Sequence, residues 1–286
     1  MIPKIIHYIW LGGKPLPELA EQCIASWQKH MPDWQIMRWD ETTLKKPIPN
    51  PCPEGKGADL TCESSPSNNE ECWLQQMPLY VQQAYAARRF AFVSDYIRLW
   101  ALEQYGGLYM DTDVEVLKSF EPLMQDVAFI GLEESRAHLP GTCVMACEPH
   151  CKWVKDMLTL YEEIEFIKPD GTLDLTTNVQ RMGVVMVKEL RSERMNELTN
   201  ERVSELGKYW KQVQYVEVWG LRVYTHDYFS PITSTRVMRK TKNTYSIHHF
   251  MGSWTETKRK GGWREWTITR ELINALVQIK RRISKH

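Results

Sequence analysis

A helix, a glycine pair and an acidic strand end follow one another in Phe92–Val116, FVSDYIRLWALEQYGGLYMDTDVEV. Gly106 and Gly107 suit the end of a helix, where a positive φ angle is favoured. The apolar run LYM that comes next is typical of a short buried strand. Asp111 and Asp113 follow at a spacing of two, so on extended chain both carboxylates project to one side. Such a pair of oxygen ligands favours a hard divalent cation.

The helix before the glycine pair carries charges of its own. Ser94 is predicted to cap it, and the helix is expected to run to Tyr105. Asp95 falls in its first turn, where the helix dipole favours a carboxylate. Asp95 and Arg98 are three residues apart and share a face. An exposed ion pair would contribute little, whereas their closeness to the acidic pair favours a carboxylate and a guanidinium presented beside a cation site.

The beginning of the chain reads as a strand, a helix and a second strand. Lys4–Leu11 is a nearly continuous apolar run, typical of a strand buried on both faces. Pro17–His30 has helical spacing with Pro17 at the first position, and Trp34–Trp39 is the next strand candidate. This order predicts an α/β fold whose ligands lie beyond the carboxyl ends of the strands. Trp10 stands at such an end.

Further elements are expected along the rest of the chain. Helices are predicted at Leu79–Arg89, His150–Glu165 and Asn178–Leu190, and a charged helical excursion at Arg191–Trp210. Strands are predicted at Val127–Leu132, Thr142–Ala146, Val213–Val218, Leu221–Tyr224 and Thr244–Phe250. One elaborated domain, residues 1–260, is the expected organisation for a chain of 286 residues.

Residues 45–77 interrupt this pattern with prolines, glycines and a polar SSPSNNEE run, and are predicted to form a long inserted loop. Cys52, Cys62 and Cys72 are evenly spaced within it. A zinc site normally takes four ligands, and no fourth is evident here, so loop thiols or a disulfide are favoured. The other four cysteines lie in patterned segments and are expected to be reduced core thiols.

Charge and hydropathy limit the classes of partner. Lys plus Arg and Asp plus Glu number 36 each, so no overall field favours nucleic acid. No secretory signal is evident and no apolar run approaches a membrane span, so a cytoplasmic location is expected. Residues 261–286 read as a basic amphipathic helix ending in KRRISKH. This helix suits either a solvated face or peripheral contact with anionic lipid.

Additional metal ligands are sought near the end of the chain. A calcium loop starting at Asp111 is excluded, because its sixth and twelfth positions are Val116 and Pro122 rather than Gly and Glu. The candidates are His248 and His249, with Ser253 shortly after them. One or two carboxylates with a distant His or hydroxyl would leave positions open for phosphate oxygens. A pair of core histidines is the alternative reading.

At these residues the sequence resembles a known family. The run SDYIRLWALEQYGGLYMDTDVEVL resembles the DXD-bearing sugar transferases of glycosyltransferase family 32, which includes capsular-polysaccharide enzymes and yeast Golgi mannosyltransferases. The segments IPKIIHYIWLGG, FIGLEE and NTYSIHHFMGSW match in the same order, so the resemblance spans Ile2–Trp254. It implies a GT-A fold, a Rossmann-like α/β domain with helical excursions. It also implies a nucleotide-sugar donor, Mn²⁺ or Mg²⁺, and transfer with retention.

The resemblance assigns a role in donor binding to five residues. Trp10 matches the aromatic residue that stacks on the nucleobase. Asp95 and Arg98 match a pair that contacts the donor sugar and the diphosphate. Asp111 matches the carboxylate that contacts sugar or ribose, and Asn178 corresponds loosely to a donor-sugar contact. Acceptor recognition cannot be carried over.

The resemblance assigns the metal and the leaving diphosphate to a second group. Asp113 matches the main metal ligand. His248 or His249, together with Ser253, match the C-terminal metal and phosphate contacts. Trp254 matches the residue that caps the leaving diphosphate. A divalent ion together with Arg98 and the indole N–H of Trp254 could neutralise the charge that builds on this leaving group.

These observations predict a metal-dependent retaining glycosyltransferase. Asp95, Arg98, Asp111 and Asp113 are its predicted catalytic residues. It would move a hexose from a nucleotide sugar to a glycan or lipid-linked polysaccharide precursor at the inner membrane face. A glycosidase fits less well, because it needs one of two flanking carboxyls kept protonated. A metal-dependent nucleotide-sugar phosphohydrolase and an inactive sugar-nucleotide-binding protein are the alternatives.

Overall fold

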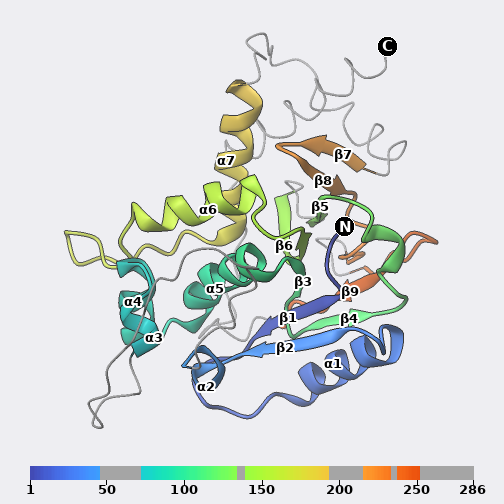
Figure 1. The fold of residues 1–286 in the computed structure, drawn as a ribbon, viewed down its shortest axis with the longest axis horizontal. Coiled ribbons are helices and arrows are strands. Elements are labelled where there is room, and N and C mark those ends of the chain that lie inside the picture. Colours follow the sequence, from blue (N-terminus) through green and yellow to red (C-terminus); the bar gives the residue numbers. More distant parts are fainter. Residues whose placement is uncertain (46–71, 134–138, 193–214, 233–236, 252–286) are drawn as a thin grey trace, which may run out of the picture.

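The computed structural model describes residues 1–45, 72–133, 139–192, 215–232 and 237–251 (Figure 1). Of the segments expected from the sequence, the insertion up to residue 71, the excursion at 193–214 and the basic tail lie outside these ranges, as do Ser253 and Trp254. No helix within the described ranges is both long and apolar enough to cross a membrane.

A seven-stranded mixed sheet forms the centre of the molecule, in the order β2-β1-β3-β6-β5-β8-β7. Its strands are β1 (Ile5–Ile9), β2 (Gln35–Trp39), β3 (Gly107–Met110), β5 (Ala128–Glu133), β6 (Leu139–Cys147), β7 (Tyr215–Val218) and β8 (Leu221–Tyr224). β1 is parallel to both β2 and β3, whereas β6 is antiparallel to β3 and β5. β5 and β8 are again parallel. A separate two-stranded antiparallel sheet pairs β4 (Val114–Val116) with β9 (Ser246–His248).

Helices cover both faces of the large sheet (Figure 1). They are α1 (Glu18–His30), α2 (Glu41–Leu44), α3 (Cys72–Gln75), α4 (Leu79–Ala86), α5 (Phe90–Tyr105), α6 (Lys152–Glu162) and α7 (Asn178–Ser192), with a 3₁₀ turn at Glu121–Leu123. The α/β class predicted from the sequence is confirmed.

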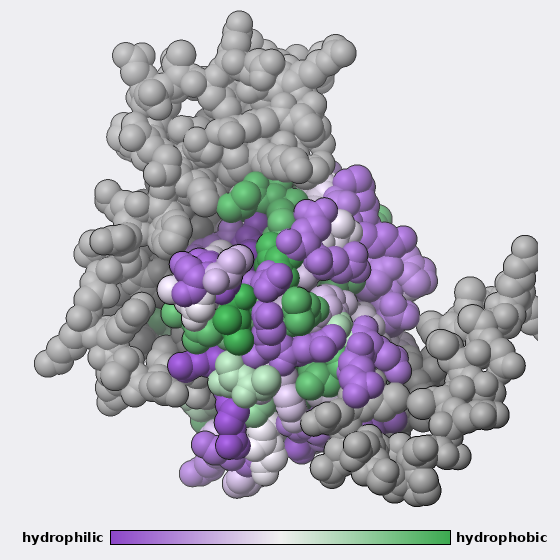
Figure 2. All heavy atoms as spheres, turned by 90° about the vertical axis from the view of Figure 1, so that its left-hand side faces the viewer, coloured by the Kyte–Doolittle hydropathy of each residue, from purple (hydrophilic) through white to green (hydrophobic). Residues whose placement is uncertain are grey.

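Two apolar clusters lie on opposite faces of the sheet because successive residues of a strand point to opposite sides. Tyr109 in β3 packs with α4, α5, α6 and α7 in one cluster. Leu108 and Met110 pack with Trp27 of α1 in the other. Trp27 is fully buried, and its Nε1 donates to the carbonyl oxygen of Val114 at 2.7 Å, which links α1 to the small sheet. The described surface on the left of Figure 1 carries polar residues with apolar ones between them (Figure 2).

Two predictions about where helices begin were wrong. α5 begins at Phe90 with Arg89 as its cap residue, so Ser94 does not cap it. The buried side chains of Phe92 and Val93 extend the apolar stripe of the helix toward its N-terminus, which explains the earlier start. Pro17 caps α1 instead of occupying its first position.

The end of the predicted inserted loop is helical as well. α3 occupies Cys72–Gln75, where a loop was expected. Trp73 is buried against the main core and meets Tyr85 edge to face, with ring centroids 5.5 Å apart. This aromatic contact gives the short helix an apolar anchor that the polar composition of the preceding segment conceals.

Candidate functional site

The glycine pair after α5 directs the chain into the centre of the sheet. Gly106 has φ 62° and closes the helix, with its N–H donating to the carbonyl oxygen of Leu102 at 2.8 Å. Gly107 has φ 97°, and a Cβ there would lie 2.6 Å from the carbonyl oxygen of Ile5. β3 can therefore pack tightly beside β1 only if this residue has no side chain. β3 then delivers Asp111 at its carboxyl end, and the N–H of Asp111 donates to Cys143 O at 2.9 Å.

The chain turns between the two aspartates. The extended geometry expected for Asp111 and Asp113 is wrong, because a turn joins β3 to β4 and the N–H of Val114 donates to Asp111 O at 3.0 Å. Asp113 is instead fixed from the end of the chain. Its Oδ2 accepts from the N–H of Met251 at 2.7 Å, and its carbonyl oxygen accepts from the N–H of His249 at 3.0 Å. The chain directly after β9 thus holds Asp113 in place.

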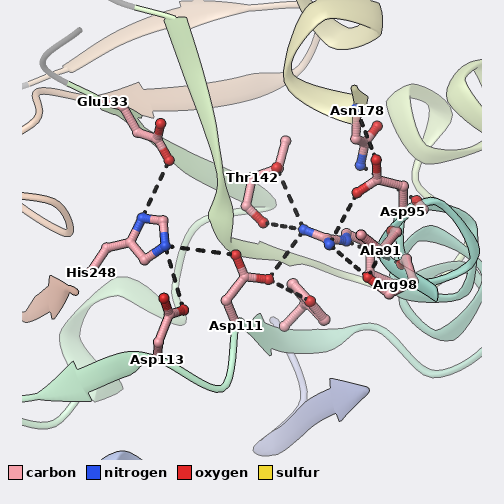
Figure 3. Close-up of polar contacts among 11 residues, drawn as sticks. Ala91, Asp95, Arg98, Asp111, Asp113, Glu133, Thr142, Asn178 and His248 are labelled. Atoms are coloured by element: carbon pink, nitrogen blue, oxygen red, sulfur yellow. Dashed lines mark hydrogen bonds and ion pairs between the residues drawn. The ribbon is translucent and has the colours of Figure 1, made fainter. Parts of the chain in front are cut away.

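His248 meets both carboxylates (Figure 3). Its Nε2 lies 3.4 Å from Asp113 Oδ1 and 4.0 Å from Asp111 Oδ2. The three side chains form a group whose ligand atoms lie within 4.8 Å of one another. His249 takes no part in this group, since its Nε2 is 3.0 Å from Glu115 Oε2. Of the two histidines proposed from the sequence, the structure brings His248 to the aspartates.

The donor set fits Mn²⁺ or Mg²⁺. An ion that holds its ligands at about 2.1 Å separates neighbouring ligand atoms by about 3 to 4 Å, and the two distances from His248 Nε2 to the aspartates, 3.4 and 4.0 Å, lie in this range. Carboxylates are ligands that both Mn²⁺ and Mg²⁺ accept, and an imidazole is a further ligand for a divalent transition-metal ion. Asp111, Asp113 and His248 are the residues that would hold the ion.

The electrostatics of the group also call for a cation. Burial raises the pKa of Asp111, and the nearby charge of Asp113 raises it further, against the effect of Arg98. Burial disfavours ionisation of Asp113 as well, but contacts with His248 and Met251 N–H leave the pKa of Asp113 lowered. Burial opposes the charged form of His248, yet its neighbours Cys143, Asp113 and Glu133 raise the pKa of the ring well above its ordinary value. The site therefore favours positive charge beside Asp113.

The Arg98 side chain forms hydrogen bonds and ion pairs with several other protein groups (Figure 3). Its Nε donates to Ser94 O at 3.1 Å, and Nη2 donates to Ser94 Oγ at 2.9 Å. Nη1 donates to Thr142 O at 3.0 Å. The remaining contacts are ion pairs, Nη2 with Asp95 Oδ1 at 3.1 Å and Nη1 with Asp111 Oδ1 at 3.3 Å. All three nitrogens of the guanidinium therefore donate hydrogen bonds within the protein, and both terminal nitrogens also form ion pairs.

Asp95 lies between Arg98 and the start of α7. The backbone N–H of Asn178 donates to Asp95 Oδ2 at 3.0 Å, and Asn178 Nδ2 donates to Asp95 O at 3.4 Å. Burial raises the pKa of Asp95, while Arg98 and the helix N–H oppose that rise. Asn178 is 1% exposed, and its Oδ1 has no hydrogen bond within the described part of the chain. The structure thus places Asn178 beside the Asp95–Arg98 pair.

Trp10 follows β1, whose carboxyl end lies at the same edge of the sheet as that of its parallel neighbour β3. The indole is half-buried, and its Nε1 donates to Lys14 O at 2.6 Å. The sequence placed Trp10 and Asp111 at strand ends, and the parallel pairing of β1 and β3 brings these ends together.

The sequence did not single out three neighbours of the acidic pair. Tyr109 donates its hydroxyl to Asp111 Oδ1 at 2.6 Å, and its ring lies under the Arg98 guanidinium, 4.6 Å from centroid to Cζ. Thr142 accepts from Arg98, and Glu133 lies beside His248. The alternation of β3 turns Tyr109 to the same face as Asp111, a signal that the sequence did contain. No comparable signal links Thr142 or Glu133 to the site, because the strand pairing brings them there.

The comparisons with known proteins agree with this geometry. Residues 17–130 match the family model described as glycosyltransferase sugar-binding region containing DXD motif. The matched region is 114 of the 286 residues long, less than half of the chain. It includes α5, β3 and both aspartates, so the resemblance predicted from the sequence is confirmed.

Two curated proteins are similar to parts of the chain. Inositol phosphoceramide mannosyltransferase 1 of Schizosaccharomyces pombe is 26% identical over 132 residues, which cover 45% of this chain and 33% of that protein. Glucan organizing enzyme 1 of Cryptococcus neoformans is 24% identical over 197 residues, or 58% of this chain and 45% of that protein. The chain therefore matches less than half the length of either relative.

Solved structures of glycosyltransferases are similar as well. The PaToxG glycosyltransferase matches with a TM-score of 0.42 and 19% identity, covering 67% of this chain and 72% of that one. The galactosyltransferase LgtC, solved with donor and acceptor sugar analogues, has a TM-score of 0.33 and 14% identity, covering 63% of this chain and 70% of that one.

Proposed function

We propose that this protein is a metal-dependent, retaining glycosyltransferase that transfers a hexose from a nucleotide-sugar donor to a glycan or lipid-linked saccharide. One observation carries the proposal. His248 is brought from the far end of the described chain to within 3.4 Å of Asp113 and 4.0 Å of Asp111, in the segment that matches the DXD family. Mn²⁺ or Mg²⁺ is the proposed cofactor, and retention is proposed from the family resemblance.

The residues of the site have two different roles, binding the metal and positioning the carboxylates. Asp111, Asp113 and His248 would hold the divalent ion, which supplies positive charge next to a departing diphosphate. Arg98 favours the ionised forms of Asp95 and Asp111 and holds their carboxylates in place before a donor arrives. Buried, preorganised charges of this kind need little rearrangement during a reaction, and this is a main source of electrostatic catalysis.

The acceptor and the location are proposed on other grounds. The name of the Schizosaccharomyces pombe relative gives a phosphoceramide as its substrate, which supports a lipid-linked acceptor here. The basic sequence at residues 280–286 supports peripheral contact with the inner face of a membrane. Deleting these residues is expected to weaken binding to anionic vesicles, and unchanged binding would contradict the membrane contact.

The donor can be found by thermal shift with Mn²⁺ across a panel of nucleotide sugars, since a ligand that binds the folded state raises the melting temperature. Mn²⁺-dependent turnover of the best donor is then measured in the wild type, in Asp113→Asn and in Asp33→Asn. Asp33 lies on the surface, where its carboxylate is 64% exposed. Asp113→Asn is expected to lose turnover by at least about a hundredfold, the size of a lost electrostatic contact in a transition state, whereas Asp33→Asn should match the wild type.

The product distinguishes the proposal from its alternatives. A glycosylated acceptor supports a transferase. Free sugar with no transfer to any of the supplied glycans or lipid-linked saccharides would indicate the phosphohydrolase instead. Binding without turnover would indicate an inactive sugar-nucleotide-binding protein, and equal turnover in Asp113→Asn and wild type would refute the metal assignment.

A further inference from the structure

Glu133 faces the side of the His248 ring that points away from the aspartates (Figure 3). His248 Nδ1 lies 3.5 Å from Glu133 Oε1, while Nε2 faces Asp113. The carboxylates of Glu133 and Asp113 therefore lie at opposite edges of the His248 imidazole. Glu133 is the last residue of β5, 115 positions before His248, and the metal group of Asp111, Asp113 and His248 does not include it.

A buried imidazole that binds a metal through Nε2 must carry its proton on Nδ1. His248 is 9% exposed, so Nδ1–H is shielded from water and needs an acceptor from the protein. Glu133 Oε1 lies at the outer limit of hydrogen-bond distance, and Nδ1 makes no closer bond within the described residues. A small approach of the Glu133 carboxylate would complete the bond.

The fold gives Glu133 and the ring defined positions. Glu133 pairs with Leu139 of β6 across a strand register that shifts at Gly131. Gly141 leaves room for its side chain, because a Cβ at that position would lie 3.0 Å from Glu133 Cγ. Phe250 packs against His248 with ring centroids 4.0 Å apart. The ring is thus held on a face by Phe250 and faced at one edge by Glu133.

We propose that Glu133 is a positioning residue that orients His248 and fixes its Nδ1–H tautomer, so that Nε2 is presented to the divalent ion. This inference rests on the proposed metal site. A carboxylate behind a metal-binding histidine makes the imidazole a better ligand and restrains its rotation, and loss of such a partner typically weakens metal binding by about 10- to 100-fold. Glu133 itself does not touch the ion or the donor.

A metal site on the Nδ1 side of the His248 ring is the alternative to this role of Glu133. Glu133, Cys143 and His248 also place ligand atoms within 4.8 Å of one another. A thiophilic ion there would take Nδ1 and leave a proton on Nε2, which faces Asp111 and Asp113. That arrangement would remove His248 from the site for Mn²⁺ or Mg²⁺. The thiol of Cys143 is buried and would have to lose its proton to bind. The geometry therefore favours Glu133 as a partner of the ring.

The matched control is the neighbouring pair of Glu115 and His249. Glu115 Oε2 lies 3.0 Å from His249 Nε2, so Glu115 is also a carboxylate beside an imidazole. This imidazole belongs to the residue that directly follows His248. It is outside both candidate metal groups. Replacing Glu115 therefore removes a carboxylate–histidine contact close to the site without changing the orientation of His248.

The test measures the dissociation constant of Mn²⁺ by calorimetry on the full chain, without any donor. Glu133→Ala is expected to raise it about 10- to 100-fold. Glu133→Gln, which keeps an acceptor oxygen and the side-chain volume, should raise it less. Glu115→Ala and Glu115→Gln should leave it unchanged. Circular dichroism checks that each variant is folded, and Glu133→Gln carries the test if Glu133→Ala is not.

Three results would overturn the proposal, and they can be told apart. Wild-type affinity in the folded Glu133 variants, with binding lost in Asp113→Asn, refutes the role of Glu133 and leaves the metal site standing. No Mn²⁺ or Mg²⁺ binding by the wild type refutes both. An ultraviolet thiolate-to-metal band on adding Cd²⁺, absent in Cys143→Ser, shows that Glu133 belongs to a thiophilic metal site instead.

Discussion

Arg98 and Asp111 form an ion pair, with Nη1 of the buried arginine 3.3 Å from Oδ1 of the aspartate, whose side chain is 26% exposed. The guanidinium is 6% exposed and also pairs with Asp95, so a single cation lies between two carboxylates that come from different elements. α5 supplies Arg98 and Asp95, and the end of β3 supplies Asp111. The pair therefore ties the helix to the strand end that carries the candidate metal site.

Replacing Arg98 tests this link. Arg98→Met keeps most of the volume but leaves Asp95 and Asp111 buried without their cation. We expect the free energy of unfolding to fall by about 3–5 kcal/mol, the cost of removing one partner of a buried pair. Urea unfolding followed by circular dichroism measures it. Lys4→Met is the control, because the Lys4 side chain is 43% exposed and pairs with surface carboxylates, and it should change stability far less. Equal losses in the two variants would contradict a structural role for the Arg98 network.

Much of this region could be predicted from the sequence because its signals are local. The apolar runs of β1 and β3, the glycines after α5 and the pair of aspartates are each contained in a few neighbouring residues. Gly106 and Gly107 adopt the positive φ angles that the sequence indicated. Their conformations depend on the chain next to them rather than on distant packing, which explains why the prediction was right.

The rest depends on contacts between distant segments. The sequence predicts only that Glu133 lies at the end of a buried strand. Its contact with His248 joins residues 115 positions apart in the sequence. The sequence offered His248 and His249 as equivalent ligands, because neighbouring residues of an extended chain point to opposite sides and the sequence does not show which side faces the aspartates. The contact between Arg98 and Asp95 is local to α5 and could be expected from their spacing, whereas the contacts of Arg98 with Thr142 and Asp111 depend on how the helix packs on the sheet.

The hydroxyl of Tyr109 gives a second test of the network. Tyr109→Phe keeps the ring beneath Arg98 but removes the hydrogen bond to Asp111 Oδ1, which is 2.6 Å long. A hydrogen bond to a charged group contributes about 1.5–3 kcal/mol, so the unfolding free energy should fall by that amount. Tyr105→Phe is the control, because the Tyr105 hydroxyl is buried without a hydrogen bond in the described part of the chain. That variant should be neutral or slightly more stable, and an equal loss in both would contradict the assigned bond.

The position of β3 beside β1 depends on Gly107. Gly107→Ala adds a Cβ 2.6 Å from Ile5 O at a residue with φ 97°. Gly171→Ala is the matched control, since Gly171 has φ 79° and nothing within 4 Å of an added Cβ. Both variants carry the backbone penalty of about 1–2 kcal/mol for an L-residue at positive φ. Gly107→Ala should lose about 1–3 kcal/mol more, because the added atom overpacks the core. Equal unfolding free energies in urea would show that β3 can shift away from β1 without cost.

His7 predicts how stability depends on pH. It is fully buried in β1, where Nδ1 accepts from Trp39 Nε1 at 3.1 Å and Nε2 donates to Gly106 O at 2.8 Å. Burial lowers the pKa of His7 from 6.5 to about 4, although the bond to Gly106 opposes the shift. Between these values the unfolded chain takes up a proton that the folded protein excludes. The stability due to neutral His7 is therefore complete above about pH 6.5 and is lost as pH falls toward 4.

The measurement compares wild type with His7→Gln, in which the amide cannot titrate but can still donate to Gly106 O. Other groups lose or gain protons equally in the two proteins, so their difference in unfolding free energy isolates His7. Going from pH 7.5 to 4.5, the wild type should lose about 2–3 kcal/mol more than the variant, as expected for a pKa lowered from 6.5 to about 4. Parallel pH curves would mean that His7 takes up its proton equally in the folded and unfolded chain, and the neutral tautomer read from its two hydrogen bonds would be wrong.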